Sequence, residues 1–166
     1  MSHSTASLQF IHIRNSRVGK VLAFACLFLL PFVSSCTIEN YDDGGLDGFW
    51  HLEQVDTLST GGSNDLSSVK RFWGFQGKLL AMYDYPIDGL NPTTNVISRF
   101  KREGDKVRLY DFYMNDRENG DVMITDVDEL SLFGISKLDE QWVIVRVDHG
   151  TLVLRSERFA LRFRKF

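Results

Sequence analysis

From residue 48 onward, the chain is a series of short runs rich in Val, Ile, Phe, Tyr and Trp that are separated by turn residues. Runs of this length and composition are typical of β-strands, and no stretch carries the extended 3.6-residue periodicity of an amphipathic helix. The linkers at residues 103–105 (EGD) and 148–150 (DHG) are hairpin signals, so neighbouring strands are expected to pair antiparallel. Eight runs are predicted to be strands: 48–56, 69–76, 78–85, 95–102, 106–113, 141–147, 151–156 and 158–165.

The last of these runs indicates how a strand divides between a core and solvent. Phe159, Leu161 and Phe163 fall on one face, whereas Arg162 and Arg164 fall on the other, as in a half-buried sheet. Many short strands at hairpin spacing form either a sandwich or an up-and-down barrel. We predict the barrel, an all-β fold of eight antiparallel strands, because closing a meander removes the edges at which sheets aggregate.

A short apolar run precedes the β-rich part of the chain. It covers residues 21–33, which makes it shorter than the roughly 20 apolar residues of a membrane-spanning helix. Arg14, Arg17 and Lys20 lie ahead of it, and the first acidic residue is Glu39. A basic flank followed by a short apolar run is typical of a signal peptide, which is removed on export.

The apolar run ends in Val33-Ser34-Ser35-Cys36, which resembles the lipobox of bacterial lipoprotein signals. The resemblance implies that residues 1–35 are a lipoprotein signal peptide and that Cys36 becomes an acylated N-terminal residue. It also implies several acyl chains on this residue, since a single chain holds a protein at a membrane only marginally. The alternatives are a secretory leader that is cleaved elsewhere and a small membrane anchor.

The net charge of the segment that follows the leader disfavours one class of partner. The chain carries 19 Lys and Arg against 22 Asp and Glu, and three of the basic residues lie in the leader, so residues 36–166 have a formal charge of −6. An acidic domain repels phosphate backbones, so nucleic acid is not an expected partner. Residues 36–47 are acidic and glycine-rich, and they are predicted to be a lipidated cysteine with a flexible tether to a domain at residues 48–166.

The predicted domain opens with Gly48-Phe49-Trp50, and Gly-x-Trp at the start of a first strand resembles the lipocalins. The resemblance implies an eight-stranded antiparallel barrel in which Trp50 closes one end. It also implies that Arg162 or Arg164, near the end of the last strand, packs over this indole, an attraction of about 0.5–2 kcal/mol. The whole plan looks like the small lipocalin-like lipoproteins of Bacteroides-type bacteria, most of which have no assigned activity. The alternative for Trp50 is a core aromatic of another β-fold.

A ligand site inside the barrel is predicted from the second run. Arg71, Trp73 and Phe75 share one strand face, and ligand pockets are mostly apolar with a few polar groups that fix orientation. Arg71 would then meet an acidic head group of a small apolar or amphipathic ligand, with no cofactor. The alternative is that these aromatic rings belong to the core.

Residues 114–136 interrupt the meander and are too long for a bare loop. Thr125 and Asp128 fit a capping box, which predicts one or two helical turns that cover an end of the barrel, and an additional strand is the alternative. The stretch at residues 115–121 (NDRENGD) resembles a calcium-binding loop in composition. Arg117 occupies a position that such a loop uses for an oxygen ligand, so we predict a turn and no metal site.

The sequence shows no constellation of catalytic residues. His51 and His149 are the histidines that follow the leader, they lack zinc spacing, and there is no Gly-x-Ser-x-Gly motif. We therefore predict a protein that is not an enzyme and is anchored through lipid in the cell envelope, at the outer membrane facing the periplasm or the cell surface. Its barrel is expected to bind a small apolar or amphipathic ligand. The alternative is an envelope interaction or inhibitor protein whose barrel is filled and holds no ligand.

Overall fold

The computed structural model describes residues 44–116 and 118–166, and this part of the chain is almost entirely β-structure. Each of the eight predicted runs forms a strand, with bounds that differ from the prediction by no more than two residues. The predicted signal segment, Cys36 and most of the predicted tether lie outside the described residues. The eight main strands are β1 (Gly48–Thr57), β3 (Lys70–Gln76), β4 (Leu79–Tyr85), β5 (Thr94–Glu103), β6 (Lys106–Met114), β8 (Asp139–Val147), β9 (Thr151–Arg155) and β10 (Phe159–Lys165).

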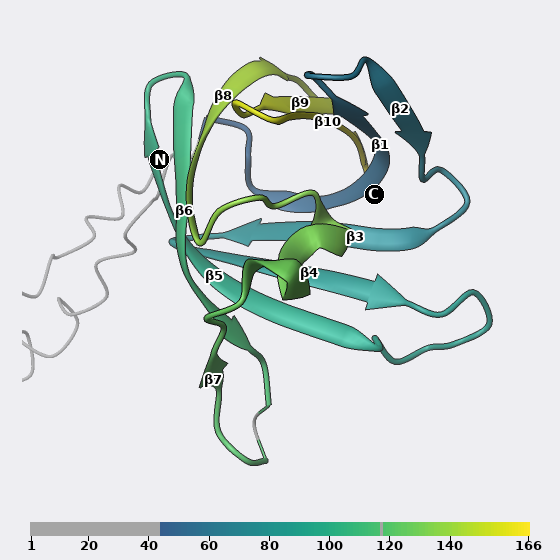
Figure 1. The fold of residues 1–166 in the computed structure, drawn as a ribbon, viewed down its shortest axis with the longest axis vertical. Coiled ribbons are helices and arrows are strands. Elements are labelled where there is room, and N and C mark those ends of the chain that lie inside the picture. Colours follow the sequence, from purple (N-terminus) through teal and green to yellow (C-terminus); the bar gives the residue numbers. More distant parts are fainter. Residues whose placement is uncertain (1–43, 117) are drawn as a thin grey trace, which may run out of the picture. The chain divides into compact units, whose positions relative to one another are not determined.

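The eight strands form a closed antiparallel barrel (Figure 1). Each main strand pairs with the next main strand along the chain, from β1 through β3 to β10, and β10 then pairs with β1. In this closing pair Trp50 lies opposite Lys165, and Thr57 lies opposite Phe159. The predicted fold class, an eight-stranded antiparallel up-and-down barrel, is confirmed.

Two short strands that were not among the predicted runs extend the sheet. β2 (Gly62–Asp65) pairs with the second half of β1, beyond the point where β1 leaves β3. β7 (Val122–Met123) pairs with the end of β6 and projects from the barrel wall (Figure 1). Both are exposed on both faces, so they lack the apolar alternation that identifies a strand in a sequence.

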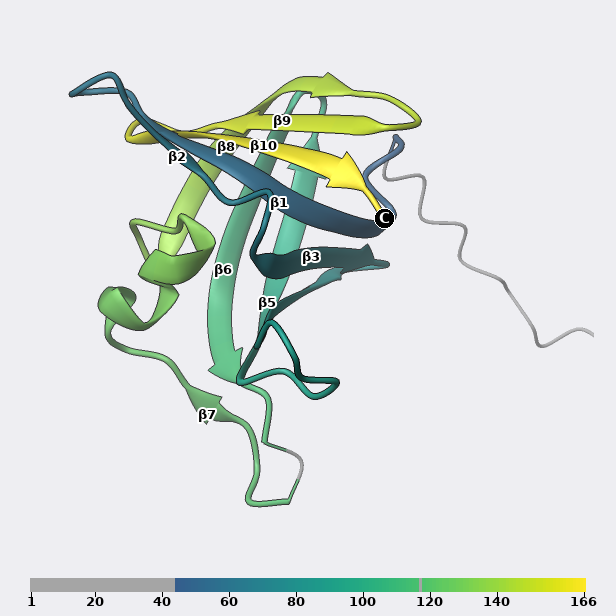
Figure 2. The same cartoon turned by 90° about the vertical axis from the view of Figure 1, so that its right-hand side faces the viewer.

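The segment between β6 and β8 contains both a strand and helical turns, the two alternatives predicted for it. The 3-10 helix η2 (Val127–Phe133) follows β7. The predicted capping box is wrong, because the N-cap is Asp126 and its carboxylate accepts from the Asp128 amide N–H. Leu130 and Phe133 are buried in the core, and Figure 2 shows these turns at the side of the barrel away from the C-terminus. Within the described residues, no helix is both long and apolar enough to cross a bilayer.

Alternate residues of every main strand point into the barrel and form one core. The three indoles of the chain lie in it with no exposed surface, and apolar side chains from each strand surround them. The interior is therefore packed with large rings wherever the structure describes it. Its largest fully buried side chains are Trp50, Trp73, Trp142, Phe112, Phe133 and Phe163.

Candidate functional site

Trp50 closes one end of the barrel, and Lys165 is the cation that covers its ring. The indole N–H donates to the carbonyl oxygen of Leu46, which is itself fully buried, at 2.7 Å. Lys165 Nζ lies 4.1 Å from the centre of the Trp50 ring, and it also donates to the carbonyl oxygen of Asp47. The expected partner, Arg162 or Arg164, is therefore wrong: in β10 the inward positions are 161, 163 and 165, so both arginines face outward.

Gly48 is required at this end of the barrel for two reasons. Its φ of 122° lies in a region that side-chain-bearing residues rarely adopt. A Cβ atom at this position would also overlap the side-chain end of Lys165. The glycine therefore leaves the space through which the lysine reaches the indole two residues further on, which gives the Gly-x-Trp pattern a physical basis.

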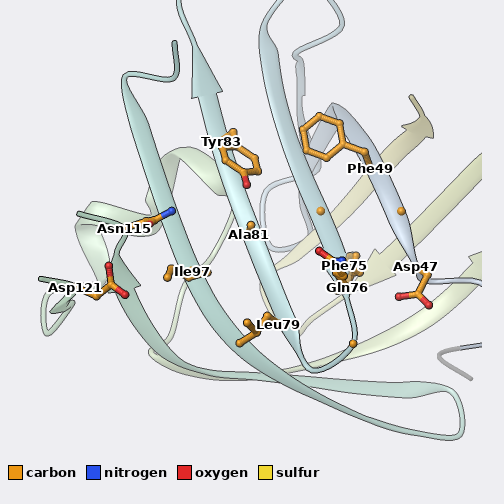
Figure 3. Close-up of a pocket in the computed structure, with 13 residues that line it drawn as sticks. Asp47, Phe49, Phe75, Gln76, Leu79, Ala81, Tyr83, Ile97, Asn115 and Asp121 are labelled. Atoms are coloured by element: carbon orange, nitrogen blue, oxygen red, sulfur yellow. The ribbon is translucent and has the colours of Figure 1, made fainter. Parts of the chain in front are cut away.

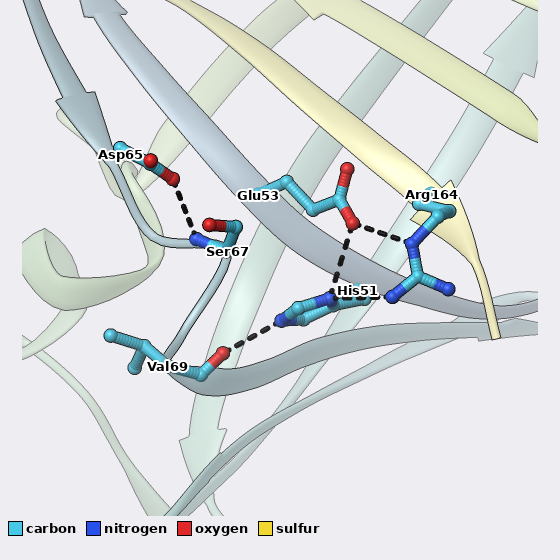
Figure 4. Close-up of polar contacts among 6 residues, drawn as sticks. All are labelled: His51, Glu53, Asp65, Ser67, Val69 and Arg164. Carbon is cyan, nitrogen blue, oxygen red and sulfur yellow. Dashed lines mark hydrogen bonds and ion pairs between the residues drawn. The ribbon is translucent and has the colours of Figure 1, made fainter.

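Arg164 lies on the outer face of the barrel, where it joins His51 and Glu53 (Figure 4). Its Nε donates to Glu53 Oε1 at 2.5 Å, and its Nη2 lies 3.4 Å from His51 Nδ1. His51 Nε2 lies 2.7 Å from the carbonyl oxygen of Val69, which can only accept, so Nε2 carries the hydrogen and Nδ1 faces the guanidinium. Both ring nitrogens thus have structural partners, and the arrangement links β1 and β10 with Val69, the residue that precedes β3.

Asp65 is the last residue of β2 and Ser67 lies in the turn that leads to β3, and Figure 4 shows both. The Ser67 amide N–H donates to Asp65 Oδ1 at 2.9 Å, and this bond holds the pKa of the Asp65 carboxyl below its usual value. The carboxylate therefore shapes the turn that leads into β3.

The residues predicted to bind a ligand inside the barrel are placed on one strand face, but their side chains already have other partners. Trp73 and Phe75 are buried in the core, where their rings lie 6.1 Å apart. Arg71 donates from both Nε and Nη2 to Asp84 Oδ1 at 2.8 Å, and it is only 15% exposed. These contacts correspond to the alternative in which the rings belong to the core, with Arg71 neutralised by a carboxylate on β4.

Trp73 and Trp142 meet inside the barrel at a right angle, with ring centres 6.3 Å apart. Neither indole N–H has a conventional hydrogen-bond acceptor, although both rings have no exposed surface. A perpendicular pair places the edge of one ring against the face of the other, and an N–H group can bond weakly to such a π-face. The two rings pack against each other, and Trp73 also packs against Phe163, so these buried rings occupy the centre of the barrel.

A cavity of a size suited to a small molecule lies on the outer wall of the barrel, over β3, β4 and β5 (Figure 3). We call it the outer groove. Its volume is about 700 Å³, within the range of about 300–1,000 Å³ that is typical of small-molecule sites. Its lining comprises Asp47, Gly48, Phe49, Gly74, Phe75, Gln76, Gly77, Leu79, Ala81, Tyr83, Ile97, Asn115 and Asp121.

The groove is hollow because two small residues face each other on the outer surface of the sheet. Gly74 of β3 lies opposite Ala81 of β4, and Ala81 lies opposite Ile97 of β5. Phe49 covers Gly74 closely, since a Cβ at Gly74 would lie 3.1 Å from Phe49 Cδ2. A glycine inside a strand often marks such a close approach. The sequence therefore contained a signal for this site, Gly74 within an aromatic strand, that the prediction of an internal site did not use.

Aromatic rings extend the apolar wall of the groove. Phe49 stacks on Phe72 with ring centres 4.9 Å apart, and it meets Tyr83 at 5.7 Å with an interplanar angle of 53°. Phe166, which is 76% exposed, contacts both Phe49 and Phe72 edge to face. An aromatic patch on an outer sheet face is a feature of binding surfaces, since a solvated face ordinarily carries polar side chains.

Polar side chains lie around the rim of the groove. In Figure 3, Asp47 and Gln76 lie at one side, while Asn115 and Asp121 lie at the other. Asp121 Oδ1 accepts from the Asp116 amide N–H at 3.1 Å, which fixes the turn that follows β6. The rim therefore offers carboxylate and amide oxygens to a ligand whose body rests on the aromatic and aliphatic floor.

A second hollow, of about 480 Å³, is lined by charged residues that pair with one another. Arg108 donates to Asp139 and lowers the pKa of this carboxyl, and Lys137 donates to Glu157 at 2.6 Å and lowers the pKa of that one. Glu140 accepts from the amide and hydroxyl of Ser136. These charges are satisfied internally, and no group of three or more metal-ligating side chains occurs among the described residues.

Comparisons with known proteins agree with the barrel geometry. A family model described as a lipocalin-like domain matches residues 30–166. A lipocalin-like protein from Bacteroides uniformis is similar with a TM-score of 0.55 and 23% sequence identity, over 74% of this chain and 100% of that chain. An uncharacterized protein from Bacteroides eggerthii gives a TM-score of 0.54 and 17% identity, over 72% of this chain and 98% of that one. These two structures support the fold, and no curated protein matches the chain.

Proposed function

Since the chain belongs to the lipocalin-like domain family, we propose that it is a non-catalytic binding protein of the cell envelope that holds a small amphipathic ligand in the outer groove. A barrel of this kind is compatible with the binding of small hydrophobic molecules. Here the chain's own indole rings are buried in the interior, so we place the ligand site on the outer wall.

The outer groove is the observation that carries this proposal. Its floor is apolar, with Ala81, Ile97 and the ring of Phe49, and its polar groups are few and lie at the rim. Small-molecule sites combine these two features, because the apolar floor supplies affinity while a few polar groups fix orientation. An amphipathic molecule of modest size meets both requirements.

A matched pair of groove and wall variants tests the site. We expect native mass spectrometry of the chain, purified without denaturation, to detect a small bound mass that Ala81→Phe removes by filling the groove. Val143→Phe is the control, because Val143 is 39% exposed on the outer face of β8 and outside the lining. A bound mass that survives Ala81→Phe would contradict the proposal.

The proposed anchor is an acylated Cys36, which lies outside the described residues. Its support is the lipobox-like Val33-Ser34-Ser35-Cys36 behind a short apolar run and a basic flank. Labelling cells with radioactive palmitate should mark the parent chain and leave Cys36→Ala unmarked, whereas equal labelling would refute the anchor. Protease treatment of intact cells would then distinguish surface display, in which the domain is cleaved, from a periplasmic orientation.

A second candidate is an interaction or inhibitor protein that engages another envelope protein through its loops. The observation that favours it is the linker between β4 and β5, where Ile87 is 74% exposed and Leu90 is 95% exposed. Apolar side chains at a loop tip often mark protein contacts. Crosslinking in intact cells should capture a partner with the parent chain and lose it with the Ile87→Ser, Leu90→Ser double variant.

A further inference from the structure

We infer that the outer groove selects organic cations, namely an ammonium group attached to an apolar or aromatic body. This inference rests on the proposed function, because it specifies the chemical class of the ligand in the same groove. Three features of the groove carry it: the sign of its charges, the arrangement of its aromatic rings and the apolar character of its floor.

The charges that line the groove are negative. Asp47 and Asp121 belong to its rim, and none of the lining residues in the described part of the chain is Lys, Arg or His. A carboxylate near a binding site attracts cations and repels anions, and residues 36–166 as a whole carry a formal charge of −6. An anionic ligand such as a fatty acid would meet repulsion here.

Two basic side chains that flank the groove have partners of their own. Lys165 donates to the backbone carbonyl of Asp47 and lies over the Trp50 ring, and among the described residues it forms no ion pair with a carboxylate of the rim. Arg99, which lies opposite Leu79 on the neighbouring strand, is 4.0 Å from the Asp111 carboxylate on β6. The acidic character of the rim is therefore not cancelled by these two cations.

The aromatic rings give a cation a second reason to bind. Phe49 and Tyr83 are tilted by 53° with ring centres 5.7 Å apart, and Figure 3 shows both at the same end of the groove. The face of an aromatic ring is electronegative, so an ammonium group within about 6 Å of its centre is attracted to it. Two tilted rings at this end of the groove form a corner that suits a quaternary or primary ammonium group.

The floor suits the body that carries this group. Ala81 leaves the outer surface of the sheet open beside the Phe49 ring that covers Gly74. Ile97 and Leu79 border this floor. A flat or aliphatic body placed there would bury apolar surface, while its cationic group lies at the rings and the rim. The same geometry disfavours a strongly polar body, since the floor offers few hydrogen-bonding groups.

Three probes that share one ring test the charge preference: benzyltrimethylammonium, benzyl alcohol and benzenesulfonate. Titration of the chain with each probe, followed by NMR chemical shifts, should give tightest binding for the ammonium probe, about tenfold tighter than for the alcohol, with the sulfonate weakest. Ala81→Phe should abolish the binding of all probes. Asp47→Asn should reduce the preference for the cation by several-fold, whereas the control Asp128→Asn, an exposed acid on η2 outside the lining, should leave it unchanged.

The outcomes separate this inference from the proposed function. If the alcohol or the sulfonate binds as tightly as the cation, and Ala81→Phe still abolishes binding, the groove is a ligand site and the inference about charge is overturned. If binding of the three probes is absent or insensitive to Ala81→Phe, the groove is not the site and the proposed function fails with it.

Discussion

The contact between the Lys165 ammonium group and the Trp50 ring is expected to contribute measurably to the free energy of unfolding. Lys165→Met keeps most of the aliphatic stem but removes the charge 4.1 Å from the centre of the indole ring. For a partly exposed cation we expect a loss of about 0.5–1 kcal/mol in the free energy of unfolding, the lower part of the range for cation–π contacts. In a domain of this size, that loss corresponds to a melting temperature lower by about 2–5 °C.

A double-mutant cycle isolates this contact from other effects of the substitution. Trp50→Leu removes the ring, the bond to the Leu46 carbonyl and much buried surface, so by itself it should cost about 3–5 kcal/mol. In that background Lys165→Met should cost almost nothing, which leaves a coupling energy of about 0.5–1 kcal/mol. Urea unfolding followed by far-ultraviolet circular dichroism measures each corner, because the cycle itself removes a fluorescent indole.

Arg162→Met is the matched control, since it removes the same charge from the same strand on the outer face. Its effect on stability should be independent of Trp50. A coupling energy below about 0.3 kcal/mol for Lys165, or a larger coupling for Arg162, would refute the assignment of Lys165 as the cation at the closed end.

Three further predictions concern the same framework. Gly48→Ala should cost about 1–3 kcal/mol, because its φ of 122° and the adjacent lysine exclude a side chain, whereas Gly104→Ala, with φ 63° and open space around it, should cost less in the same chemical unfolding assay. Glu140→Gln should cost about 1–3 kcal/mol in thermal unfolding, because its buried amide would present a donor to the two Ser136 donors. The pKa of Asp148 is lowered to about 2 by the amide N–H groups of the turn, with Gly150 first, so its contribution to stability is present above pH 4 and is lost as the pH falls toward 2. Unfolding measured across this window should show a steeper loss in the parent than in Asp148→Asn, and parallel curves would contradict the assignment.

The barrel could be predicted from the sequence because apolar alternation and tight turns recur along almost the whole domain. In β10 the alternation of Leu161 and Phe163 with two arginines defined the buried face correctly. The same alternation places position 165 on the inner face, so the sequence pattern alone predicts that Lys165 points toward the closed end of the barrel. The expectation of an arginine came from the family resemblance, which named the residue type but not the face on which it lies.

The site was harder to predict, because it depends on what lies across strands. Trp73, Phe75 and Arg71 were correctly placed on one strand face, but their partners, Trp142 and Asp84, come from other strands and become visible only with the register. The outer groove depends likewise on Gly74 and Ala81 meeting as a cross-strand pair. A single sequence does not contain that pairing, since register is set by the turns and by the packing of the whole barrel.

The pairing of β1 with β10 also has a kinetic consequence. Arg164 and Glu53 are separated by 111 residues in sequence, so the seam of the barrel joins the most distant parts of the domain. Folds with such high contact order gain their final contacts late and fold in about milliseconds to seconds. Until the seven residues of β10 are in place, β1 and β9 keep unpaired strand edges. A truncation within β10 is therefore expected to cause aggregation more readily than a cut of equal length at any surface loop.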